Sequence, residues 1–136
     1  MIYLDSAAIV KLAHAEAESG ALRDWLDQRA ELSWVSSVLA EVESFRALAR
    51  HAPAAAGRLH TVLDLIDLVD LDAGIRLTAQ AVAPASVRSL DAIHLATALH
   101  LRPQLTTFVT YDRRLADAVA EAGLPIAMPA QANGPR

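Results

Sequence analysis

The chain has 136 residues, of which 54% are hydrophobic and 21% are charged, and it contains no cysteine. This length fits one domain with ample apolar material for a core, and the composition excludes a wholly disordered chain. The lack of cysteine excludes disulfides, thiolate metal sites and cysteine nucleophiles. The net charge of −4 argues against generic electrostatic binding of nucleic acid, which normally needs a basic surface.

The composition also bears on location. No apolar run approaches the roughly 20 residues of a membrane helix, and Met1–Asp5 lacks the basic leader of a secretory signal. We therefore expect a cytoplasmic protein with no membrane partner. Lys11 is the only lysine, and every other basic residue is arginine. This bias suits phosphate recognition, but codon usage explains it equally well.

In the first half of the chain, short apolar strands alternate with helices. The expected elements are a strand at Met1–Leu4, helices at Ala7–Ala13 and Ser19–Arg29, a strand at Leu32–Ser36, and helices from Ser37 to about Arg50 and over Arg58–Ile66. Leu22, Trp25 and Leu26 recur at helical spacing, and Ser37 is a typical N-cap residue.

The second half continues the same alternation. The expected elements are a strand at Leu68–Leu71, a helix from Asp72 to about Val82, a helix at Leu90–Leu101 capped by Ser89, a strand at Leu105–Val109, a helix from Asp112 to near Gly123, and a short strand at Pro125–Met128. The pattern predicts a single α/β domain with a short, mostly parallel sheet of four to five strands and helices on both faces. We place this domain at residues 1–129 and expect 130–136 to form a flexible tail.

Four acidic residues are the candidate functional groups. Asp5 follows the first strand, Glu43 lies on the helix after the second, Asp91 lies at the start of a helix, and Asp112 comes just after the fourth strand. Ligands of parallel sheets bind beyond the carboxyl ends of the strands, so these side chains are expected near one edge. Four carboxylates there repel one another unless cations intervene, and hard oxygen ligands suit Mg²⁺ or Mn²⁺.

Each acid also has a purely structural interpretation. Asp5 and Asp112 fit as N-caps, and Asp91 is favourable in the first turn of its helix because of the helix dipole. Glu43 would fit a solvated helix face equally well, and Glu41 is its rival as a ligand. Two residues along a helix correspond to a rotation of about 200°, so only one of the two can face a cleft. The spacing alone does not choose between them.

The sequence resembles the PIN-domain family and, within it, the VapC-type ribonuclease toxins of bacterial toxin–antitoxin pairs. The resemblance rests on segments that follow one another in the family's order and together cover nearly the whole chain. These are Met1–Ala8, Ser36–Ala47, Arg88–Ala98, Thr110–Leu115 and Gly123–Pro125. Each segment is a weak signal alone, but the run Leu-Asp-Ala-Ile-His-Leu-Ala-Thr-Ala within Arg88–Ala98 follows the family pattern almost verbatim.

This resemblance implies a PIN-like fold and hydrolysis of RNA phosphodiester bonds that depends on Mg²⁺, with Mn²⁺ as a substitute. Family members place an acid directly before a short stretch that ends in Arg-Ala, which here favours Glu43 over Glu41. Asp5, Glu43, Asp91 and Asp112 are then the expected catalytic and metal-binding residues. The resemblance also implies products with 5′-phosphate and 3′-hydroxyl ends, a cognate VapB-type antitoxin that blocks the site, and a homodimer.

Residues around the acids have expected supporting roles. Ser6 follows Asp5 where relatives carry Ser or Thr, and it is expected to orient a carboxylate or a metal-bound water. His94 lies three residues after Asp91 and shares its helix face. Metal ligation by His94 stays open, but packing or a hydrogen bond behind the metal ligands is the preferred interpretation.

The arginines allow more than one interpretation. Arg113 and Arg114 directly follow Asp112 and are expected to meet RNA entering the site. Arg46 and Arg50 lie one helical turn apart, and they contact either RNA phosphate or the acids of a partner. A solvated helix face is an equally good interpretation for all of these arginines.

Functions of other classes are less well supported. A response-regulator domain needs a lysine late in the chain, whereas the single lysine is Lys11. A haloacid-dehalogenase site usually has a second Asp two residues after the first, where this chain has Ala7. The remaining alternative is a non-catalytic PIN-like module that binds RNA or protein.

Overall fold

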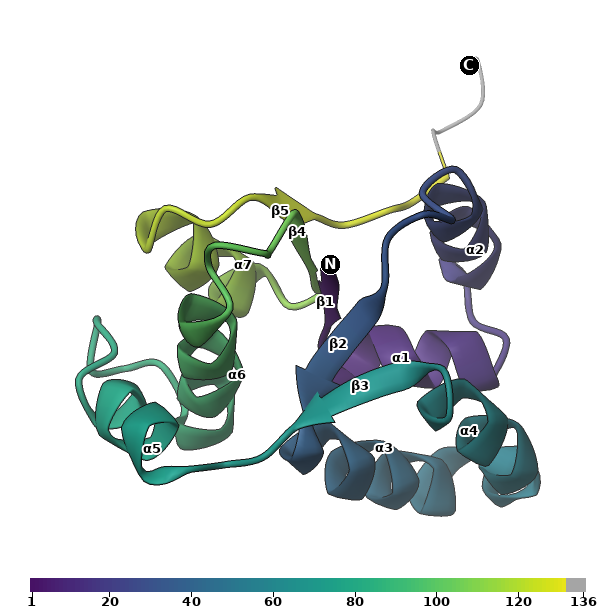
Figure 1. The fold of residues 1–136 in the computed structure, drawn as a ribbon. Coiled ribbons are helices and arrows are strands. Elements are labelled where there is room, and N and C mark those ends of the chain that lie inside the picture. The colour runs from purple at the N-terminus through teal and green to yellow at the C-terminus, as the bar shows by residue number, and fades with distance from the viewer. Residues whose placement is uncertain (132–136) are drawn as a thin grey trace.

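The computed structural model describes residues 1–131, which form a five-stranded sheet with strand order β3-β2-β1-β4-β5 (Figure 1). Every pair of neighbouring strands is parallel. The strands are β1 (Ile2–Leu4), β2 (Trp34–Ser37), β3 (Ile66–Val69), β4 (Thr107–Val109) and β5 (Ile126–Ala127). This confirms the predicted fold class. Most of the expected tail at 130–136 lies outside the described residues.

Helices cover both faces of the sheet and enclose two hydrophobic clusters (Figure 1). One cluster takes residues from α1 (Ser6–Ala13), α2 (Ser19–Asp27), α3 (Val38–His51) and α4 (Ala56–Leu63), with a short 3₁₀ turn at Pro53–Ala55 before α4. The other cluster takes residues from α6 (Ser89–His100) and α7 (Arg113–Glu121). The remaining helix, α5 (Ala73–Gln80), packs against α6.

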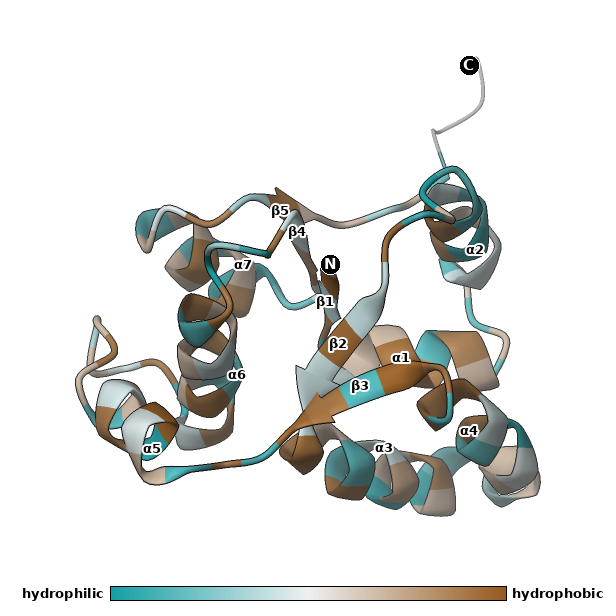
Figure 2. Cartoon of the chain, in the orientation of Figure 1, coloured by the Kyte–Doolittle hydropathy of each residue, from teal (hydrophilic) through white to brown (hydrophobic). Residues whose placement is uncertain are grey.

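The central strand β1 is buried on both faces. Ile2 and Leu4 belong to the first cluster and Tyr3 to the second, and all three are fully buried. Side chains alternate across a strand, so a strand covered on both faces needs the unbroken apolar run that stands here. Figure 2 shows the hydrophobic colour over most of β3, at the edge of the same sheet.

The sequence prediction was wrong about the connection between α4 and β3. The helix expected over Arg58–Ile66 ends at Leu63, and the strand expected at Leu68–Leu71 begins at Ile66. A short apolar run fits a helix and a strand equally well by periodicity. Pairing decides the outcome, because Ile66 lies opposite Trp34 of the neighbouring strand.

Capping side chains start several of the helices. Asp5, Ser37, Asp72 and Asp112 each accept a hydrogen bond from a backbone N–H in the first turn of α1, α3, α5 and α7. The predicted cap at Ser89 is wrong, because α6 already begins at that residue and its N-cap, Arg88, makes no side-chain capping bond. After α7, Gly123 has a φ of 83°, a left-handed conformation that favours glycine and turns the chain toward β5.

Candidate active site

Asp5 lies where β1 ends and α1 begins. Its Oδ1 accepts a hydrogen bond of 2.9 Å from the backbone N–H of Ala8, and only 4% of the residue is exposed. Burial raises the pKa of Asp5 and the charge of Asp91 raises it further, although Thr110, Ala8 and His94 act in the opposite direction. Asp5 is therefore a helix cap, as the structural interpretation had it, and also a buried carboxyl group at the carboxyl end of the central strand.

Glu43 projects from α3 toward the same place and is held by two side chains. Ser6 Oγ donates a hydrogen bond of 2.5 Å to Glu43 Oε1, and His94 Nε2 lies 2.6 Å from the same oxygen. Burial raises the pKa of Glu43, but the hydrogen bonds from His94 and Ser6 outweigh it, and the net pKa lies below its ordinary value. Ionised Glu43 is thus the form that this arrangement stabilises.

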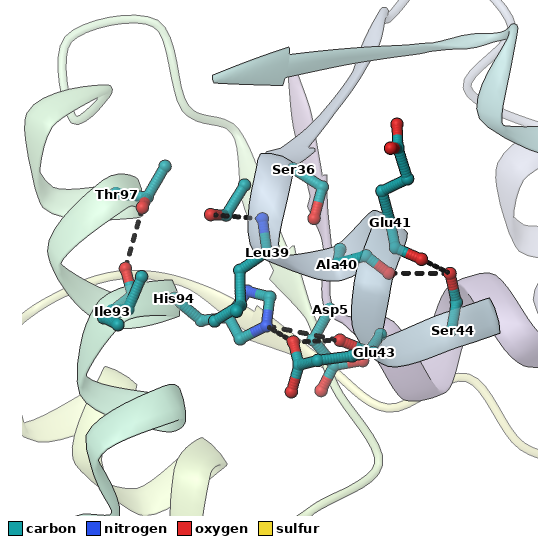
Figure 3. A network of polar contacts seen from close by, with 12 residues as sticks. Asp5, Ser36, Leu39, Ala40, Glu41, Glu43, Ser44, Ile93, His94 and Thr97 are labelled. Atoms are coloured by element: carbon teal, nitrogen blue, oxygen red, sulfur yellow. Dashed lines mark hydrogen bonds and ion pairs between the residues drawn. The ribbon is translucent and has the colours of Figure 1, made fainter. Parts of the chain in front are cut away.

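Glu41 and Glu43 point in different directions. Figure 3 shows Glu43 turned toward His94 and Asp5, whereas Glu41 extends away from them. Glu41 is exposed, and its backbone carbonyl accepts a hydrogen bond from Ser44. The structure therefore brings Glu43, and not Glu41, to the edge of the sheet where Asp5 lies.

Asp91 and Asp112 complete the group of acids. Asp91 lies in the first turn of α6 and is half-buried. Burial raises the pKa of Asp91, and the charges of Asp112 and Glu43 raise it further, whereas His94 and Arg88 lower it. Asp112 Oδ1 accepts hydrogen bonds from the backbone N–H groups of Arg114 (2.8 Å) and Leu115 (3.3 Å).

Asp91 therefore lies within electrostatic range of Asp5, Glu43 and Asp112, at the carboxyl end of the sheet. These acids do not form a complete metal-binding site, however. Within residues 1–131, no three or more Asp, Glu or His side chains are grouped so that they could hold a metal ion. The arrangement is a cluster of oxygen ligands in which Glu43 is well supplied with hydrogen bonds, while Asp5 and Asp91 keep raised pKa values.

His94 sits behind this cluster and is itself buried, with 2% exposed. Its Nδ1 lies 2.7 Å from the hydroxyl of Tyr3, and its Nε2 faces Glu43 and, at 3.3 Å, Ser6 Oγ. Burial raises the pKa of the Tyr3 phenol well above its ordinary value. The preferred sequence interpretation, a hydrogen bond behind the acids, matches this geometry.

The sequence analysis missed two residues of the site. Tyr3 stands inside the predicted strand Met1–Leu4, and Thr110 opens the segment Thr110–Leu115 of the family resemblance, without a role of its own in either case. Thr110 is buried directly after β4, acts to lower the pKa of Asp5, and accepts a hydrogen bond from the backbone N–H of Asp112 at 3.1 Å. The available signal was its position, because Thr110 directly follows β4, the neighbour of β1, on the same side of the sheet as Asp5.

The predicted arginines are exposed. Arg113 and Arg114 begin α7, directly after Asp112, and Arg46 and Arg50 lie on the outer surface of α3. Arg114 also lines an apolar groove of about 1190 Å³ formed by α5, the loop before α6, and parts of α6 and α7. None of the four acids lines this groove.

Comparisons with known proteins agree with the fold. A family model described as PIN domain matches residues 2–121. The chain is 47% identical to Ribonuclease VapC35 of Mycobacterium tuberculosis over 98% of this chain and the whole of that protein. It is 39% identical to Ribonuclease VapC47 of the same organism, over 95% of this chain and 97% of that one.

A solved structure supports the same fold at much lower identity. The crystal structure of VapBC2 from Rickettsia felis, bound to a DNA fragment from their promoter, superposes with a TM-score of 0.73 at 14% identity, covering 93% of this chain and 98% of that one. No helix among residues 1–131 combines the length and the apolar character needed to cross a membrane. With the family model and these relatives spanning nearly its full length, the chain belongs to the PIN-domain family and, within it, to the VapC-type ribonucleases.

Proposed function

We propose that this protein is a divalent-metal-dependent endoribonuclease and the toxin of a toxin–antitoxin pair. The observation that carries the proposal is the convergence of Asp5, Glu43, Asp91 and Asp112 from four separate segments on one edge of the sheet. Helix capping accounts for Asp5 and Asp112 individually, but it does not account for the position of Asp91 within electrostatic range of the three other acids. The names of the relatives at 39–47% identity support the assignment to RNA hydrolysis.

The ligand chemistry fits Mg²⁺ or Mn²⁺. The candidate ligands are carboxylate oxygens, and burial together with neighbouring charges raises the pKa of both Asp5 and Asp91. A cation near them would relieve that repulsion. Mg²⁺ usually binds through one or two carboxylates and completes its shell with waters and substrate phosphate, so it does not require a preformed group of three protein ligands. Asp5 and Asp91 are the residues to hold it, with Glu43 and Asp112 acting directly or through water.

Held by these carboxylates, Mg²⁺ would lower the pKa of a water molecule and would offset negative charge on the phosphate. The protein's own groups do the rest. Asp5 is fixed by its capping bond to Ala8, and Glu43 is fixed by Ser6 and His94, so both carboxylates keep their positions without substrate. Arg113 and Arg114 are exposed beside Asp112 and are suited to contact RNA phosphates, which offsets the net negative charge of the chain.

The proposal includes a protein partner. A VapB-type antitoxin is expected over the region Ala40–Ile66, where the inner faces of α3 and α4 are already packed in the core. What this region offers to a partner is its outer surface, with Arg46, Arg50 and the 56%-exposed Val42. Acidic groups of an antitoxin would complement these arginines. A cytoplasmic homodimer remains a prediction from the family.

A non-catalytic PIN-like binding module is the second candidate. The observation that favours it is that residues 1–131 contain no group of three or more side chains already placed to hold a metal ion. Such a protein would bind RNA or a protein partner and leave the RNA intact.

Incubation of the purified protein with a mixed RNA pool separates the two candidates. We expect cleavage with Mg²⁺ or Mn²⁺, none with EDTA, and products that carry 5′-phosphate and 3′-hydroxyl ends. Asp91→Asn should lose cleavage, whereas the exposed control Glu41→Gln should retain it. Equal cleavage in EDTA would contradict the metal requirement, and RNA binding without cleavage in every metal would favour the binding module.

A further inference from the structure

The chain Tyr3–His94–Glu43 runs from the buried core to the edge of the acid cluster. The hydroxyl of Tyr3 lies 2.7 Å from His94 Nδ1, and His94 Nε2 lies 2.6 Å from Glu43 Oε1. Tyr3 is fully buried, His94 is 2% exposed, and the Glu43 side chain is 23% exposed. Both ring nitrogens of His94 are therefore engaged, one on the core side and one on the site side.

The contact with Glu43 requires a proton on Nε2. An ionised carboxylate only accepts hydrogen bonds, and the proton of Ser6 Oγ already points to the same oxygen. A ring nitrogen without a proton at 2.6 Å would place two acceptors against each other. In the tautomer with its proton on Nε2, the imidazole has a free lone pair on Nδ1.

The contact with Tyr3 fits this assignment. A buried phenol keeps its proton at neutral pH because the ordinary pKa of tyrosine is about 10. The phenol lies 2.7 Å from Nδ1 of His94, within hydrogen-bond distance of that free lone pair. With the phenol as donor, the protons along the chain all point toward Glu43.

We propose that Tyr3 and His94 are positioning residues. Tyr3 donates to Nδ1 and thereby holds the ring of His94 with the Nε2 proton facing Glu43, and His94 in turn holds the carboxylate of Glu43 toward the acid cluster. This inference rests on the proposed function only in that Glu43 serves RNA cleavage. Packing alone does not explain the arrangement, because the Tyr3 ring stacks on Phe108 at 4.6 Å and would do so without its hydroxyl.

The first test is made on the metal-free protein, so it is independent of catalysis. Nitrogen-15 spectra of histidine-labelled protein report which ring nitrogen carries the proton, and the carboxyl carbon-13 shift reports the environment of Glu43. We expect the Nε2–H tautomer for wild-type His94. Tyr3→Phe keeps the stacked ring, and it should mix the two tautomers and shift the Glu43 signal. A proton on Nδ1 of the wild-type ring, or unchanged spectra in Tyr3→Phe, would overturn the proposal.

The second test uses RNA cleavage and a pair of replacements at His94. The amide nitrogen of Gln can stand in for Nε2 as a donor, whereas Phe keeps the ring volume and has no donor. We expect kcat to fall about 10-fold in Tyr3→Phe and more in His94→Phe, with KM nearly unchanged, and His94→Gln to recover part of the loss. His100→Gln on the exposed end of the same helix is the control and should match wild type.

Together, the two tests distinguish a failure of the proposed function from a failure of the positioning role. If the wild-type protein cuts no RNA, the proposed function fails, and the spectra alone then decide the role of Tyr3 and His94. If it cuts RNA but His94→Phe and His94→Gln are equally active, His94 only fills space and the positioning role is wrong. Circular dichroism and thermal unfolding of each variant confirm that the compared proteins are folded.

Discussion

Glu43 and Asp5 belong to the same cluster of acids, but the protein shifts their pKa values in opposite directions. Glu43 receives hydrogen bonds from Ser6 and His94, and its pKa lies below the ordinary value. Asp5 is more deeply buried, receives a backbone hydrogen bond from Ala8, and its pKa is raised by burial and by the charge of Asp91. Hydrogen bonds within the protein stabilise the charged form of Glu43. In contrast, burial and the charge of Asp91 leave the charged form of Asp5 unfavourable.

This difference indicates that the two sides of the site are stabilised in different ways. The α1–α3 side is organised in advance by side-chain hydrogen bonds. The side with Asp5 and Asp91 carries unfavourable charge, which a divalent cation would relieve when it binds. Stability sacrificed at a functional site is a common pattern, and it makes the comparison testable because removing the charge should then stabilise the fold.

The largest effect is expected for Asp5→Asn. Cleavage should fall at least about 100-fold, as expected for loss of a metal ligand, while asparagine can still cap α1. The free energy of unfolding of the metal-free protein should rise at pH 7, by about 1 kcal/mol. Urea unfolding of both proteins and an RNA cleavage assay measure the two effects.

The pH dependence of that gain follows from the raised pKa of Asp5. A carboxyl group whose folded pKa lies above its unfolded value contributes stability at low pH, and this contribution is lost as the pH rises through the folded pKa. Asp5→Asn should therefore match wild type near pH 3 and exceed it at pH 7. Cleavage by Asp5→Asn at the wild-type rate in equal metal would contradict the proposed mechanism.

An intermediate effect is expected at Glu43, with Glu41 as its matched control on the same helix. Glu43→Gln removes a charge that Ser6 and His94 stabilise, so cleavage should fall about 10- to 100-fold. Glu41→Gln lies on the exposed surface, and the free energy of unfolding should change by less than about 0.5 kcal/mol with cleavage unchanged. The opposite ranking would mean that the functional acid had been assigned to the wrong position.

The smallest effect is expected for Ser6→Ala. This change removes one of two hydrogen bonds to Glu43, and the free energy of unfolding should fall by about 1 kcal/mol. Cleavage should fall only a few-fold because His94 still holds the carboxylate. Ser89→Ala is the control, since Ser89 is exposed and makes no capping bond. A loss as large as that of Asp5→Asn would show that Ser6 acts on the substrate directly.

Much of the fold could be predicted because its signals are local. Apolar runs such as Ile2–Leu4 and capping residues such as Asp112 fix elements without reference to the rest of the chain. The boundary at Ile66 could not be predicted, because its pairing with Trp34 is a contact between distant segments. The absent cap at Ser89 is a comparable case, since capping residues only favour a helix start.

The acids of the candidate site could be predicted from the sequence, but the side chains that hydrogen-bond to them could not. Asp5 and Asp112 are visible in the sequence because each follows a strand. The link from Tyr3 through His94 to Glu43 joins three segments, and no spacing along the chain reveals it. Periodicity shows that Tyr3 is buried, but only the fold shows what its hydroxyl contacts.

The central claim is that the unfavourable charge on Asp5 and Asp91 serves to bind a divalent cation. Crystals of the free protein soaked in Mn²⁺ near neutral pH test it most directly. We expect an anomalous peak within about 2.5 Å of carboxylate oxygens of both residues. The same soak of Asp5→Asn crystals should show no such peak. The absence of anomalous density at an open and unobstructed cluster in the wild-type crystals would contradict the claim. The four acids would then act mainly as helix caps and surface charges.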